Sequence, residues 1–99
     1  MHLSVLKTYG ALREKASYIQ LESDIKRIEE IESVFEYIPN RENRYCFRLY
    51  CMGYSYGQIV EMLQKNNIYY SYSAVRSKVD RVIKRLKERG VISDDTRQS

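Results

Sequence analysis

The stretch from Ser71 to Gly90, SYSAVRSKVDRVIKRLKERG, constrains the fold of this chain more than any other. Its apolar side chains fall at positions i, i+4, i+7, i+8 and i+11, which places them on one face of an α-helix. These residues are Val75, Val79, Val82, Ile83 and Leu86. The rest of the helix carries seven basic side chains and only two acidic ones. Ser71 or Ser73 can cap the first turn and Gly90 the last, so we expect a long helix with one apolar and one positive face.

A positive amphipathic helix has two interpretations. Its charged face can simply be solvated, or it can bind the phosphates of a nucleic acid. The placement of charge favours the second interpretation. Residues 1 to 38 carry five basic and seven acidic side chains, whereas residues 39 to 99 carry twelve basic and six acidic ones. We therefore expect the second part of the chain to face a negatively charged partner.

The composition argues against several functional classes. With 99 residues, 43% of them hydrophobic and 30% charged, the chain should form one globular domain, or one small domain with an appended helix. No apolar run approaches the length of a membrane span and the start lacks the apolar core of a signal peptide, so we expect a cytoplasmic protein without a membrane partner. Cys46 and Cys51 lack the paired spacings of a metal site. Since catalytic motifs are missing too, we expect no enzyme, no metal and no cofactor.

Residues 1–38 are predicted to form a long N-terminal helix. No proline interrupts Ser4 to Tyr37, helix-forming residues predominate, and Gly10 is the weak point. Several apolar side chains recur at heptad spacing. They are Leu21, Ile28, Ile31 and Phe35. The sequence leaves two uses for this stripe open: it can cover the helices that follow, or it can pair with a second copy in a homodimer or contact another partner.

The remainder of the chain is typical of three shorter helices. Pro39 ends the first helix, because the residue before a proline is disfavoured in the α conformation. Gly53 closes the next helix, and Ser55 with Gln58 forms a capping box for the one after it. We expect an all-α fold: a long N-terminal helix over residues 1–38, a three-helix helix-turn-helix domain over residues 39–92 and a flexible tail over residues 93–99.

At these residues the sequence resembles a known family. The runs RENRYCFRLYCMGYSYGQIVEML and SYSAVRSKVDRVIKRL, between Pro39 and Leu86, resemble the C-terminal promoter-binding domain of sigma factors. With a long charged helix ahead of that domain, the chain is also similar to small phage late-transcription activators of the ArpU and RinA kind. The resemblance implies a sigma-like transcription regulator of phage or mobile-element origin, acting in the cytoplasm of a bacterial host cell on double-stranded DNA, with RNA polymerase as a further partner.

One departure from the family lies in the turn before the basic helix. Leu63 and Ser71 are eight positions apart, whereas the family has only a few residues between the corresponding leucine and serine. Either the middle helix runs one turn longer or the turn is an extended arm. Both alternatives change the angle at which the basic helix is held.

Helical position and resemblance together assign roles to single side chains. The residues expected to face base edges in a major groove are Tyr72, Ser73, Arg76, Ser77 and Asp80. Among them Arg76 is the best candidate, because a guanidinium can pair with both acceptors of guanine. The residues expected to hold phosphates are Lys78, Arg81, Lys84, Arg44 and Arg48. Alternatively, these side chains are merely exposed, Tyr72 packs against Tyr69 or Ile68, and an arginine among Arg41, Arg44 and Arg48 pairs with the acidic first helix.

The sequence thus predicts a sequence-specific DNA-binding transcription regulator that reads a major groove with residues 71 to 89. One alternative is a small phage protein that uses the same fold and its tyrosine-rich middle to bind and inhibit or modulate a host protein. Another is the DNA-recognition part of a terminase small subunit, although that class usually carries a longer oligomerisation region.

Overall fold

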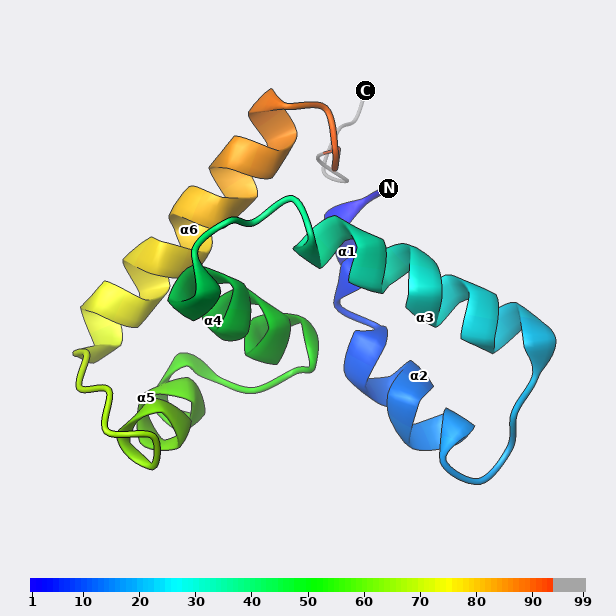
Figure 1. The fold of residues 1–99 in the computed structure, drawn as a ribbon, viewed down its shortest axis with the longest axis horizontal. Coiled ribbons are helices and arrows are strands. Elements are labelled where there is room, and N and C mark those ends of the chain that lie inside the picture. Colours follow the sequence, from blue (N-terminus) through cyan, green and yellow to red (C-terminus); the bar gives the residue numbers. More distant parts are fainter. Residues whose placement is uncertain (94–99) are drawn as a thin grey trace.

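In the computed structural model, which describes residues 1–93, the chain forms six α-helices. They are α1 (Leu3–Leu6), α2 (Tyr9–Ala16), α3 (Glu22–Phe35), α4 (Arg41–Cys51), α5 (Tyr56–Gln64) and α6 (Tyr72–Glu88). In Figure 1, α1 to α3 lie on one side of the molecule, α5 and α6 lie on the other, and α4 lies between them. The all-α fold predicted from the sequence is therefore confirmed.

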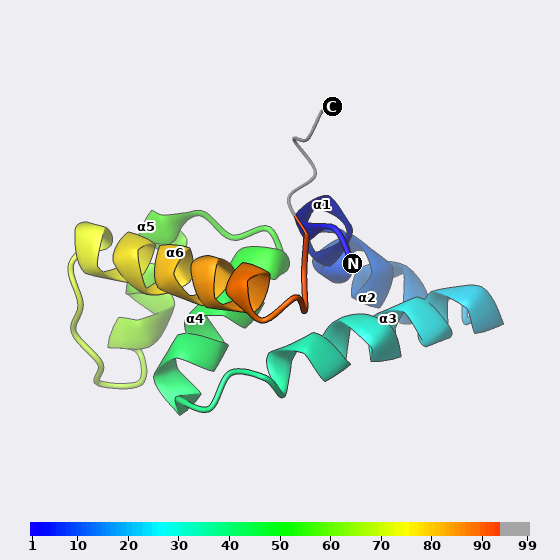
Figure 2. The same cartoon turned by 90° about the horizontal axis from the view of Figure 1, so that it is seen from above.

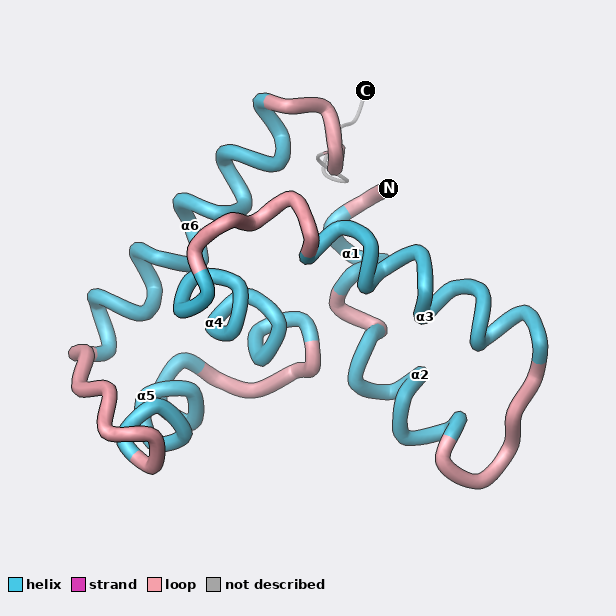
Figure 3. Tube along the Cα trace, viewed as in Figure 1, coloured by secondary structure: helices cyan, strands magenta, loops and turns pink. Residues whose placement is uncertain are grey.

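The N-terminal part differs from the single long helix expected over residues 1–38. It is divided into α1, α2 and α3, and α2 and α3 pack side by side as a hairpin (Figure 3). At both breaks a hydroxyl bonds a nearby carbonyl at 2.6 Å: Thr8 donates to Val5, and Ser17 donates to Glu14. A straight helix of this length would reach about 50 Å, beyond the longest extent of the molecule, 38 Å. Folding back lets its apolar stripe reach the core.

Side chains from both predicted parts of the chain form one core. Tyr9 and Phe35 meet edge to face with ring centroids 5.2 Å apart, and Phe35 meets Phe47 of α4 in the same way at 6.0 Å. The Tyr9 hydroxyl donates to Glu32 at 2.7 Å, which satisfies the polar end of this buried ring. Burial and this hydrogen bond raise the pKa of Tyr9. Residues 1–38 therefore share one core with α4, α5 and α6.

Local signals set the start of α4 and the turn between α4 and α5. The side chain of Asn40 accepts a hydrogen bond from Asn43 N at 2.9 Å and caps α4. Ser55 and Gln58 form the reciprocal capping box, with distances of 3.2 and 2.9 Å. Between the two helices, Gly53 has φ +99°, a backbone conformation that other residues rarely adopt. The end of α4 and the start of α5 thus follow from interactions within a few residues.

The long turn before α6 is an extended connection, the second of the two alternatives. Helix α5 ends at Gln64. Asn67 then takes the left-handed conformation with φ +62°, and Ile68 N donates back to the carbonyl of Leu63 at 3.0 Å. The chain reaches Ser71 without further helix, and α6 packs against both α4 and α5 (Figure 2).

The two ends of the described chain are bound to each other. Ser93 N donates to the carbonyl of Met1 at 2.9 Å, and Leu3 N donates to the carbonyl of Ser93 at 3.4 Å. The neighbouring Ile92 is buried in the core. The first residue of the predicted tail 93–99 is therefore held by the N-terminus, and residues 94–99 lie outside the described part.

Candidate nucleic-acid interface

Helix α6, the basic helix, is defined at both ends by the predicted caps. The Ser71 hydroxyl accepts a hydrogen bond from Ala74 N at 3.1 Å and satisfies an amide that the first turn leaves free. At the other end Gly90 has φ +73°, and Val91 N donates to the carbonyl of Leu86 at 2.9 Å. Of the two serines considered for the first cap, Ser71 fills the role.

The predicted base-reading side chains lie on the open side of α6. The opposite side is buried against α4 and α5 through Val75, Val79, Val82 and Leu86. The exposed residues are Tyr72, Ser73, Arg76, Ser77 and Asp80. Tyr72, Arg76 and Asp80 recur every four residues and form one row along the helix. The α2–α3 hairpin does not cover this side of α6, because it lies on the far side of α4 (Figure 1).

Arg76 is only weakly engaged within the chain. Its Nε lies 4.0 Å from the Asp80 carboxylate, and the two side chains are 65% and 61% exposed. An exposed ion pair four residues apart on a helix contributes about 0.3–0.5 kcal/mol. Arg76 can therefore leave Asp80 for a stronger acceptor at little cost.

An aromatic row attaches the start of α6 to α5 and α4. The ring of Tyr72 meets Tyr56 edge to face at 5.6 Å, and Tyr56 stacks on Tyr50 at 5.9 Å. Burial, followed by the nearby Tyr50 and Asp80, raises the pKa of Tyr56. Tyr72 thus packs on Tyr56, a partner that the sequence did not suggest, and it is still 55% exposed.

Lys78 differs from the other predicted phosphate ligands because α4 already engages it. Its ammonium lies 3.3 Å from the Asn43 side-chain oxygen and 4.5 Å from the centre of the Tyr70 ring. The side chain is half-buried between α6 and α4. A phosphate contact by Lys78 would therefore compete with two contacts inside the protein.

Arg81 and Lys84 are exposed, as a phosphate contact requires. Arg81 also belongs to a row with Arg85 and Arg89, and these three line a hollow of about 230 Å³ between α6 and the α3–α4 connection. Asn40 lies on the opposite wall of the same hollow. Arg85 and Arg89 were not predicted as site residues, although their spacing in steps of four from Arg81 places them on the same side of the helix.

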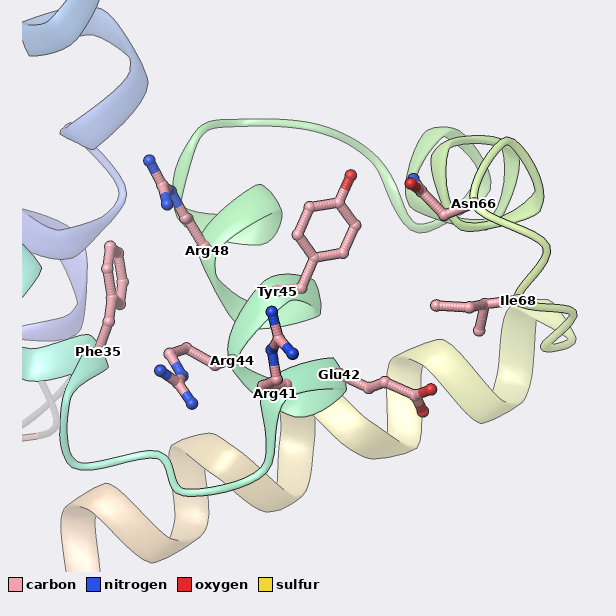
Figure 4. Close-up of a pocket in the computed structure, with 8 residues that line it drawn as sticks. All are labelled: Phe35, Arg41, Glu42, Arg44, Tyr45, Arg48, Asn66 and Ile68. Atoms are coloured by element: carbon pink, nitrogen blue, oxygen red, sulfur yellow. The ribbon is translucent and has the colours of Figure 1, made fainter.

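Arg44 and Arg48 lie on a different face from α6. Helix α6 reaches α4 on the side of Asn43, and Arg48 is nearly opposite that residue around the helix. Both arginines line a hollow of about 560 Å³ together with Phe35, Arg41, Glu42, Tyr45, Asn66 and Ile68 (Figure 4). Arg44 donates to the Pro39 carbonyl at 3.4 Å, and within residues 1–93 neither arginine forms an ion pair. They are therefore not part of the same surface as Arg76.

The residues of the heptad stripe are divided between core and surface. Ile31 and Phe35 are 0% and 6% exposed, Ile28 is half-buried, and Leu21 is 45% exposed. Of the two uses considered for the stripe, Ile31 and Phe35 cover the core of their own chain and cannot also form a dimer surface. Exposed apolar side chains gather instead near the end of the hairpin, at Tyr18, Ile19, Leu21 and Ile25.

The cysteines and the acidic residues form no metal site in the described residues. Cys46 and Cys51 are buried free thiols, and no group of three potential ligands occurs within residues 1–93. Burial raises the pKa of Cys51 to about 12, so this thiol is not an activated nucleophile. None of the described helices is both long and apolar enough to cross a membrane.

Comparison of the chain with family models, with curated proteins and with solved structures finds no match.

Proposed function

We propose that this protein is a sequence-specific DNA-binding transcription regulator whose helix α6 reads the major groove. The observation that supports the proposal is that Arg76 is exposed on the N-terminal half of α6. The opposite face of the helix is buried in the core, which holds α6 in place. Three-helix units of this kind insert the first turns of the last helix between base edges. Arg76 would pair with a guanine, while Tyr72, Ser73, Ser77 and Asp80 would line the same groove.

Phosphate binding supplies most of the affinity in this proposal. Arg81, Lys84 and Arg85 follow Arg76 along α6, and Arg89 is the C-cap residue of this helix. Basic residues beside a reading helix fix its position on the sugar-phosphate backbone. A single helix reads only a short half-site, so we also propose that the regulator acts as a homodimer. The resemblance to sigma factors supports RNA polymerase as a further partner. The similarity to small phage activators supports a phage origin for this protein, which would then act in the cytoplasm of a bacterial host.

The proposal is tested by selecting bound sequences from a random duplex library and measuring affinity for the selected site against salt. With about four phosphates neutralised per subunit, log affinity should fall with log salt at a slope near −3.6 per subunit. Arg76→Ala should lose about 1–3 kcal/mol, roughly five- to 150-fold, on the selected site and much less on random DNA.

The control for this test is Arg27→Ala, which removes one exposed positive charge on α3. It should bind the selected site like the parent, because α3 lies on the other side of α4 from α6. An affinity that does not change with salt, or Arg76→Ala binding as tightly as the parent, would contradict the proposal.

The second candidate function is a protein-binding module that modulates a host protein. The hollow on the outer face of α4 favours it, since arginines and an aromatic ring are common at protein interfaces. This alternative predicts a stable complex with a protein partner and no retardation of any duplex in the selection.

A further inference from the structure

The outer face of α4 carries a row of three exposed side chains. Arg41, Tyr45 and Arg48 are spaced by four and then three residues, which places them on one side of the helix. Figure 4 shows Tyr45 and Arg48 projecting from α4 into the hollow that Phe35 and Ile68 close at its two ends. Within residues 1–93, no carboxylate pairs with either arginine. The row thus places one positive charge on each side of an aromatic ring.

The outer face of α3 carries the opposite pattern. Glu22, Ile25 and Glu29 are exposed, and they lie on the side of α3 away from the core. In the described part of the chain neither glutamate forms an ion pair or a side-chain hydrogen bond. This row places one negative charge on each side of an apolar side chain.

The two rows match in spacing when the helices run antiparallel. Counted backwards from Glu29, the α3 residues lie at steps of four and then three, which is the order Arg41, Tyr45, Arg48 on α4. At 1.5 Å per residue, each row spans about 10 Å. Arg41 would meet Glu29, Tyr45 would meet Ile25, and Arg48 would meet Glu22.

We propose that α3 of a second copy of this chain docks antiparallel on α4, with the same contact made in return by the first copy. A two-fold axis makes such a contact self-complementary, since each residue pair then occurs twice. The inference deepens the homodimer of the proposed function by naming its surface, and it does not depend on DNA binding. Neither of the two rows contains a residue of α6.

The apolar residues near the hairpin end favour a protein occupant over a nucleic acid. The exposed Tyr18, Ile19 and Leu21 lie in the connection just before α3, next to the Glu22 end of the acidic row. An exposed apolar cluster bordered by charges is typical of a protein interface, and a sugar-phosphate backbone offers no partner for it. The charges then set the register and the orientation, while the apolar contacts supply affinity.

Paired charge reversals test the proposal in the absence of DNA. We expect the parent to be dimeric by light scattering and sedimentation, with a dimer that weakens as salt rises. The double variants Arg41→Glu with Arg48→Glu, and Glu22→Arg with Glu29→Arg, should each raise the dissociation constant about tenfold or more, because like charges then face each other. Mixing the two variants should restore a dimer that contains one copy of each, since both of its interfaces are again complementary.

The matched control reverses two charges on α6, with Arg81→Glu and Lys84→Glu. It should lose DNA binding and keep the dimer, which separates failure of the proposed function from failure of this inference. Circular dichroism shows whether each variant retains the parent's melting temperature. The proposal is overturned if the parent is monomeric, if folded α4 or α3 variants dimerise like the parent, or if the mixture of the two stays monomeric.

Discussion

At the scale of single residues, Gly10 shows how a position that weakens a helix can be required by the fold. A Cβ atom there would lie 2.3 Å from the carbonyl oxygen of Met52, at the end of α4. Because the obstructing atom belongs to the backbone, it cannot move aside as a flexible side chain could. The glycine that weakened the predicted long helix is therefore the place where α2 approaches α4 closely.

We predict that Gly10→Ala lowers the free energy of unfolding by about 1–3 kcal/mol through overpacking. In a domain of this size, that corresponds to a loss of roughly 4–8 °C in melting temperature per kcal/mol. The control is Gly57→Ala in α5, where the nearest atom is the Ser55 hydroxyl at 4.0 Å. That change should stabilise the protein by up to about 1 kcal/mol. Equal effects of the two substitutions in thermal unfolding would show that helix propensity, and not the contact with Met52, governs Gly10.

At the scale of the helices, the caps determine where α5 and α6 begin, and the packing determines which of their faces stay open. Ser55 and Ser71 are both N-cap residues whose hydroxyls accept from the third residue of the helix. The predicted base-reading residues begin in the first turn of α6, and none of them lies on α5. The two caps therefore contribute similarly to stability and differently to the proposed function.

We predict that Ser71→Ala and Ser55→Ala each cost about 1 kcal/mol of stability in denaturant unfolding. Ser71→Ala should also weaken binding to the selected DNA site by roughly fivefold, since part of the cap energy is needed to hold Tyr72 and Ser73 in place. Ser55→Ala should leave DNA affinity unchanged under conditions where both variants are folded. A loss of affinity of the same size in both variants would mean that the start of α6 is not the reading surface.

At the scale of the whole molecule, one core joins the N-terminal helices to α4, α5 and α6. Leu6 and Tyr9 are fully buried with Phe47 and Cys51 of α4. Backbone hydrogen bonds between Ser93 and the N-terminus close the molecule at its two ends. The predicted boundary at residue 38 thus separates two lengths of sequence that share one core.

We predict that a fragment of residues 39–99 is largely unfolded, because removing the first 38 residues exposes Phe47 and Cys51. Removing the packing around one large core side chain alone costs several kcal/mol. The free energy of unfolding of a whole domain is only about 5–15 kcal/mol. Circular dichroism measures the helix content of the fragment and of the full chain, and urea titration compares their unfolding transitions. A cooperative transition of the fragment at the urea midpoint of the full chain would show two independent units instead.

The sequence by itself determined the helical class, the end of α4, the start of α5, and both the ends and the buried face of α6. These features depend on interactions between residues up to about five positions apart, such as the Ser55 and Gln58 capping box and the spacing of Val75, Val79 and Val82. The exposed positions of Arg76 and Asp80 could be predicted for the same reason. Their DNA-reading role remains a proposal.

Only the tertiary structure decided how the N-terminal helices fold back, that Lys78 lies against Tyr70, and that Arg48 points away from α6. The physical reason is that helical periodicity says which face of a helix is apolar, and not which neighbour will cover that face. The free energy gained by burying apolar surface is non-directional. Whether Ile31 and Phe35 are buried in the core of their own chain or against a second copy therefore depends on how all the helices pack together.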